Sequence, residues 1–174
     1  MDILKLLPEF KVVEMNRSTG LTAGHVVSQF VLNPASTLIN KVNEGAENEF
    51  HVIENGFIVG LDRDLIVDKY NSSTHGQPFL VFTEELNRLF SGLKWYATEE
   101  DADGDIYPRL VALYVGDAFT TNNYDEDSTT DPKFAKVVNG VLTLQDSGDS
   151  DTMFAVEEST LPDGSDAMRF IYIG

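Results

Sequence analysis

The chain has 174 residues, of which 42% are hydrophobic and 10% aromatic, so it is long enough and apolar enough to fold around its own core. Its formal net charge is −17, from 29 acidic and 12 basic residues, which excludes nucleic-acid binding through bulk charge and disfavours anionic membrane surfaces. Cysteine is absent, which excludes a disulfide scaffold, a thiol nucleophile and a cysteine zinc site. We therefore expect one acidic domain whose partners include neither nucleic acid nor membrane.

Residues 1–24 are expected to form an N-terminal arm and a loop. The apolar run in residues 1–9 is short, is interrupted by Pro8 and lacks the cleavage site of a signal peptide, and no stretch of the chain is apolar enough for a transmembrane helix. We expect a protein that stays inside the synthesising cell unless it leaves as part of an assembly. A short apolar arm that orders on binding predicts partner contacts through Ile3, Leu4, Leu6, Leu7 and Phe10.

Residues 25–119 are expected to form a β-rich main domain. Apolar, β-branched runs with a period of two occupy residues 25–32, 49–54, 57–61, 65–69, 78–83 and 106–115. Thr83 is a suitable N-cap, and the leucines and Phe90 that follow share one face, which predicts a short helix near 84–92. A single helical turn is also expected before Pro8.

Residues 133–174 repeat the strand pattern and are expected to form β-hairpins packed on or beside the main domain. Asn-Gly separates apolar runs at 55–56 and again at 139–140, which predicts a tight hairpin at each position. The expected fold is mainly β, a sandwich or open barrel of about ten short strands with one or two short helices.

The acidic residues are concentrated in the second half, since residues 99–174 hold 17 of the 29 acidic and 4 of the 12 basic side chains. The sharpest cluster places carboxylates at Asp101, Asp103 and Asp105, and such alternation in a turn is typical of Ca²⁺ sites. Ile106 and Ala112 stand where an EF-hand loop carries Gly and Glu, so a hydrated turn is the alternative. These three aspartates are the candidate metal ligands, and no other cofactor is predicted.

Enzymatic motifs are absent from the sequence. It contains no Gly-x-Ser-x-Gly elbow and no phosphate-binding glycine loop, and its three histidines lie more than 20 residues apart. We therefore expect a protein that acts by binding.

Several segments resemble small head-associated structural proteins of tailed bacteriophages. They are residues 53–61 with 78–86, residues 107–123 (YPRLVALYVGDAFTTNN), and residues 138–144 with 160–164 and 168–173. The resemblance implies a β-rich, non-enzymatic decoration or cement protein that binds the major capsid protein in many copies on the capsid surface of a virion assembled in the host cytoplasm. The protein itself, as a homo-oligomer, is a further expected partner, and the arm residues named above become the expected capsid contacts.

Two alternatives stay open at this point. One keeps the virion but places the protein in the tail tube, the head–tail connector or the fibre base. The other is a Ca²⁺-dependent or carbohydrate-binding β module that uses Trp95, Tyr96 and the cluster from Asp101 to Asp105.

Overall fold

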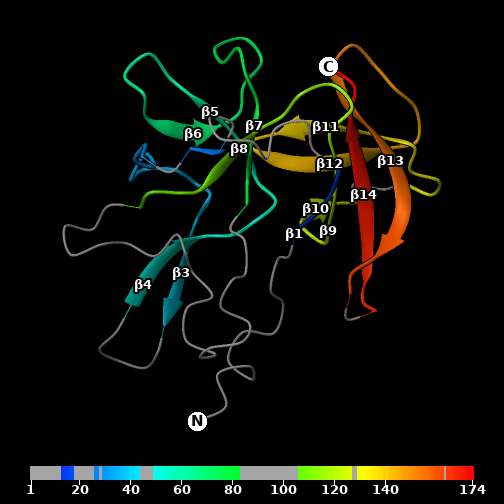
Figure 1. Ribbon diagram of the computed structural model, residues 1–174, viewed down its shortest axis with the longest axis horizontal. Helices are drawn as coiled ribbons and strands as arrows, with labels where there is room; N and C mark the ends of the chain where they lie inside the picture. Colours follow the sequence, from blue (N-terminus) through cyan, green and yellow to red (C-terminus); the bar gives the residue numbers. More distant parts are fainter. Residues whose placement is uncertain are drawn as a thin grey trace.

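The computed structural model describes residues 13–17, 26–27, 29–43, 49–82, 106–126, 129–162 and 164–174. Fourteen strands and no helix occur in this part of the chain, arranged in three sheets (Figure 1). The predicted mainly β fold class is therefore confirmed. The predicted helices near 84–92 and before Pro8 lie outside the described residues.

The larger sheet has seven strands in the order β1-β9-β14-β13-β11-β12-β10. The strands are β1 (Val13–Arg17), β9 (Ala118–Thr121), β10 (Tyr124–Asp125), β11 (Phe134–Val138), β12 (Val141–Gln145), β13 (Thr152–Thr160) and β14 (Asp166–Tyr172). Neighbours are antiparallel except β10 and β12, and the end strands do not pair with each other, so no barrel closes. The pairing of β9 with β14 joins the ranges 25–119 and 133–174 in one sheet.

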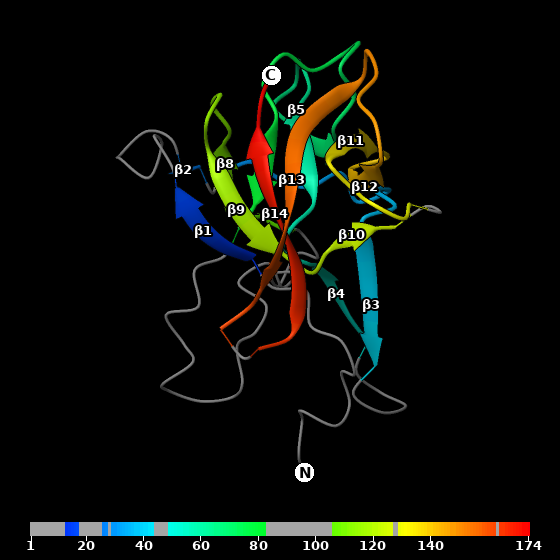
Figure 2. The same ribbon diagram turned by 90° about the vertical axis from the view of Figure 1, so that its right-hand side faces the viewer.

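The second sheet has five antiparallel strands in the order β2-β8-β7-β5-β6. They are β2 (Val26–Val27), β5 (Ile58–Leu61), β6 (Val67–Lys69), β7 (Phe79–Val81) and β8 (Leu110–Ala112). The remaining strands, β3 (Ile39–Asn43) and β4 (Glu49–Ile53), form a separate two-stranded hairpin. This hairpin projects away from the two main sheets in both side views (Figure 1 and Figure 2).

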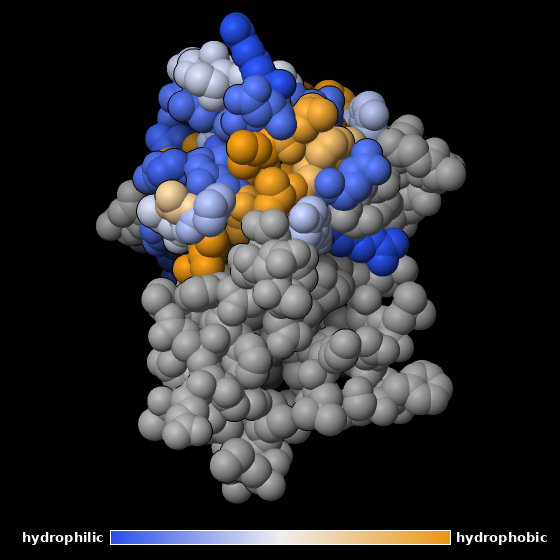
Figure 3. Space-filling model, turned by 90° about the vertical axis from the view of Figure 1, so that its left-hand side faces the viewer, coloured by the Kyte–Doolittle hydropathy of each residue, from blue (hydrophilic) through white to orange (hydrophobic). Residues whose placement is uncertain are grey.

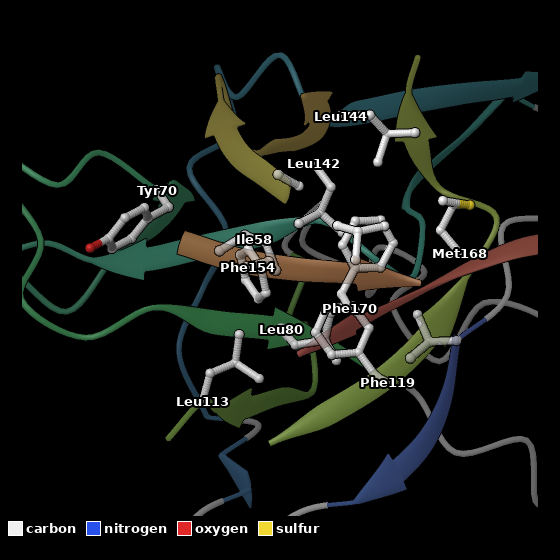
Figure 4. Close-up of a cluster of buried hydrophobic side chains, with 13 residues drawn as sticks. Ile58, Tyr70, Leu80, Leu113, Phe119, Leu142, Leu144, Phe154, Met168 and Phe170 are labelled. Atoms are coloured by element: carbon white, nitrogen blue, oxygen red, sulfur yellow. The ribbon is translucent and has the colours of Figure 1, made fainter. Parts of the chain in front are cut away.

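The two main sheets pack face to face over a buried apolar cluster, as in a β-sandwich (Figure 4). Because side chains alternate between the faces of a strand, Phe154 and Val156 of β13 are buried while Glu157 is exposed. In β5, Ile58 belongs to this cluster and its neighbour Val59 to a second cluster on the other face. The five-stranded sheet is thus buried on both faces, which explains its continuous apolar runs.

Residues 29–39 cover the outer face of the five-stranded sheet. Leu32 and Leu38 are buried there, and Leu32 forms a parallel bridge with Val67 of β6. The Asp68 carboxylate fixes this segment by accepting hydrogen bonds from Asn33 Nδ2 at 2.9 Å and Ser36 Oγ at 3.0 Å. Figure 3, which views the side that carries β5 and β6, shows apolar residues gathered in one stripe among hydrophilic ones.

The Asn-Gly turns at 55–56 and 139–140 differ in the strands that they connect. Asn139 and Gly140 have φ angles of 52° and 83°, as a type I′ turn requires, and join β11 to β12 in the predicted hairpin. The hairpin predicted at Asn55-Gly56 is wrong, because β4 pairs with β3 whereas β5 pairs with β6 and β7. Only Gly56 has positive φ there, and its N–H donates to Val81 at 2.9 Å. This turn therefore carries the chain from one sheet to another.

Candidate functional site

The site residues predicted from the sequence all lie outside the described residues. They are the arm residues Ile3, Leu4, Leu6, Leu7 and Phe10, the carboxylates Asp101, Asp103 and Asp105, and the aromatic pair Trp95 and Tyr96. Since none of these residues belongs to the described part of the chain, the roles predicted for them remain predictions.

The acid-rich turn at 146–151, between β12 and β13, uses its carboxylates for internal hydrogen bonds. Asp146 Oδ1 accepts from the amides of Thr130 and Asp131 at 3.1 and 3.0 Å. Asp149 accepts from Gln145 Nε2 at 2.8 Å and from the Asp151 amide at 2.8 Å. Among the described residues no three His, Asp or Glu side chains converge as metal ligands do.

These bonds hold the pKa of Asp149 at about 2, below its ordinary value of 3.8, because the Gln145 amide, the Asp151 N–H and then Lys136 stabilise the charged form. The folded state is favoured by this carboxylate above pH 3.8, and that contribution is lost as the pH falls toward 2. We expect an NMR carboxyl titration to show this pKa, and Gln145→Ala to raise it more than Lys136→Met does. An ordinary pKa in the unaltered protein, or the opposite order of the two variants, would contradict the assignment.

An exposed apolar tip stands at one end of the sandwich, formed by Tyr114 and Val115 of the β8–β9 turn with Ile173 after β14. Their exposed fractions are 41%, 68% and 45%, the highest for Val115. Residues 172–174 run beside the turn, since the Gly116 N–H donates to the Tyr172 carbonyl at 2.8 Å. A Cβ added at Gly174 would lie 3.6 Å from Val115 Cγ2, so the end of the described chain and the turn are neighbours.

A buried carboxylate fixes the conformation of this tip. Asp117 is fully buried, and its Oδ2 accepts the Tyr114 N–H at 2.9 Å. Its own N–H donates to the Tyr114 carbonyl at 2.9 Å, and its carbonyl accepts the Tyr172 N–H at 2.9 Å. Gly116 takes a φ of +94°, which glycine adopts without strain. The tip is thus a rigid turn.

A polar cleft of about 530 Å³ opens beside the tip, where ends of the two main sheets meet. It is lined by residues 69–72 at the end of β6, 136–139 at the end of β11 and 150–153 at the start of β13, together with Tyr172 and Gly174. Its volume lies within the range of small-molecule sites, roughly 300–1,000 Å³. Four distant segments meet here because the β11–β12 hairpin reaches across to β5, where the Ile58 N–H donates to the Gly140 carbonyl at 2.8 Å.

Two tyrosines and two lysines dominate the chemistry of this cleft. Burial raises the pKa of Tyr70 and of Tyr172, and charge repulsion from Tyr70 raises the pKa of Tyr172 further. Lys136 forms an ion pair with Asp149 at 3.4 Å. Lys69 forms no ion pair with a described carboxylate.

Sequence reasoning missed both the tip and the cleft. The tip lies within the resemblance segment 107–123, and only its exposure distinguishes Val115 from the buried residues before it. For the cleft, the available signal was a pair of Lys residues beside apolar or aromatic strand ends, at Lys69-Tyr70 and at Lys136-Val137. No local motif links these pairs.

Comparisons with protein families, with curated proteins and with solved structures find no match to this chain. In the part of the chain that the structure describes, no helix is long and apolar enough to cross a membrane.

Proposed function

We propose that this protein is a non-enzymatic structural protein of a tailed-bacteriophage particle, which binds the major capsid protein as a decoration or cement protein. The observation that carries this proposal is the rigid apolar tip, which stands within one of the segments that resemble head-associated proteins. Tyr114 and Val115 are exposed at 41% and 68% although the turn that bears them is held by a fully buried carboxylate. A fixed apolar protrusion loses little conformational entropy when it docks on a shell.

The charge of the chain is compatible with this role. A net charge of −17 keeps the protein away from packaged nucleic acid and limits association between acidic surfaces. Contact with a shell then depends on local apolar burial, since charges more than a Debye length apart, about 8 Å at physiological salt, are largely screened.

The experiment is co-elution of the purified protein with capsids of the phage that encodes it, by size-exclusion chromatography with light scattering. We expect the protein to bind in many copies per particle, and Val115→Asp to lower the occupancy about tenfold or more through the loss of apolar burial and the desolvation of a charge. Leu65→Asp is the matched control, because Leu65 is also exposed, at 54%, lies at the β5–β6 turn and has a φ of 63° that aspartate tolerates.

Each unfavourable outcome has a distinct meaning. Failure of the unaltered protein to bind capsids would overturn the decoration role. Binding limited to one ring per particle would instead support the connector or tail alternative. Unchanged occupancy of Val115→Asp would remove the tip as the contact and return attention to the arm residues Ile3 to Phe10.

A further inference from the structure

The cleft beside the tip is balanced in charge, with two lysines near two aspartates, whereas the chain as a whole has a net charge of −17. The charged side chains of its lining are Lys69, Lys136 and Asp151, and Lys136 is paired with Asp149. The β11–β12 turn approaches Lys69 closely, because a Cβ added at Gly140 would lie 3.1 Å from Lys69 Cβ. Lys69, which lines the cleft, forms no ion pair with a described carboxylate.

The two tyrosine hydroxyls add uncharged donors to the same wall. Neither Tyr70 nor Tyr172 donates its hydroxyl proton to a described residue, and both phenols are protonated at neutral pH, since the ordinary pKa of a phenol is 10.0 and burial raises it. Each ring packs against a neighbouring ring, Tyr70 against His75 at a centroid distance of 6.0 Å and Tyr172 against Phe154 at 5.4 Å. These contacts limit the movement of the two rings that line the cleft.

We propose that this cleft binds an acidic sugar, a saccharide that carries a carboxylate or phosphate group. The Lys69 ammonium and the two phenolic hydroxyls supply donors for the anionic group, because charge-assisted hydrogen bonds are the stronger kind. Exposed Ser72 and Asn139 offer partners for sugar hydroxyls, and exposed Val138 offers an apolar wall for a ring. The volume of about 530 Å³ exceeds what a bare inorganic anion fills. This inference does not depend on the capsid role.

The test is an NMR amide titration at physiological salt with digalacturonic acid and glucose 6-phosphate, with maltose and inorganic phosphate as comparison probes. We expect saturable binding of at least one acidic sugar with a dissociation constant of about 1 mM or lower, and shift changes centred on residues 69–72, 136–139 and 150–153. Maltose and phosphate alone should bind at least about tenfold more weakly, since each supplies only part of the recognised chemistry.

Two variants assign the binding to the cleft. Lys69→Met should weaken binding about tenfold and Tyr172→Phe several-fold, with the melting temperature measured for each to establish that it is folded. Lys133→Met is the matched lysine control, because Lys133 is exposed and paired with Asp131 at 2.7 Å outside the cleft. Tyr107→Phe is the matched tyrosine control, because Tyr107 is exposed at 41% and does not line the cleft. Neither control should change the affinity.

Three results would overturn the proposal. The first is the absence of saturable shifts with both acidic sugars. The second is maltose or inorganic phosphate binding as tightly as the acidic sugars, which would mark a neutral sugar site or an adventitious ion only. The third is unchanged affinity of the folded Lys69→Met and Tyr172→Phe variants, which would place the binding elsewhere.

Discussion

Replacing Phe170 by alanine should lower the free energy of unfolding by about 3–5 kcal/mol, a large part of the roughly 5–15 kcal/mol that stabilises a domain. Phe170 is fully buried in β14 at the centre of the inter-sheet cluster (Figure 4). Its ring stacks on Phe119 at 5.7 Å and meets Phe154 edge-on at 6.1 Å. Alanine would remove both ring contacts and leave a cavity that the two packed sheets cannot close.

Urea denaturation provides the measurement, with the midpoint shifting while the slope of the transition stays constant. Phe170→Leu should cost less, because it retains most of the buried volume. Phe134→Ala is a matched control, since Phe134 is only half-buried in β11. Equal losses for Phe134→Ala and Phe170→Ala would show that the aromatic cluster does not dominate the core.

The fold class follows from sequence periodicity, whereas strand pairing does not. The dipeptide Asn-Gly closes a hairpin at Asn139-Gly140 and connects two different sheets at Asn55-Gly56. The difference arises from distant partners, since Asn123 Nδ2 donates to the Asn55 carbonyl at 2.7 Å and Gly56 bonds to β7. Hydrogen bonds between residues so far apart in the chain cannot be predicted from the few residues around the turn.

The same reason limits what the sequence predicts of the candidate site. Val115 ends an apolar run whose earlier members, Val111 and Leu113, are buried, so hydrophobicity alone does not separate the exposed tip from the core. The cleft forms because the β11–β12 hairpin approaches the end of β6, and the spacing of residues in the sequence does not predict this approach. Sequence analysis favoured acidic clusters because neighbouring carboxylates are visible locally. At 146–151, however, Asp149 accepts from the Asp151 amide of its own turn and Asp146 accepts from the Thr130 amide of another loop.

Replacing Asp117 by alanine should cost about 2–3 kcal/mol of unfolding free energy and should also disorder the apolar tip. The carboxylate is fully buried, and removing it strips the Tyr114 N–H of its acceptor. Asp117→Asn should cost less, because its amide oxygen still accepts that hydrogen. Urea denaturation measures the first effect, and faster hydrogen exchange of the Tyr114 amide measures the second.

The control for this change is Asp131→Ala, which removes an exposed carboxylate that is paired with Lys133 at the surface, so its expected cost is within about 0.5 kcal/mol. If the tip makes the capsid contact, Asp117→Ala should also reduce occupancy under conditions in which the variant is folded, because loosening Val115 adds an entropy cost to docking. Unchanged exchange of the Tyr114 amide would show that the buried carboxylate does not fix the turn. If the Tyr114 amide exchanges faster while the capsid occupancy stays unchanged, capsid binding does not depend on the conformation of the tip.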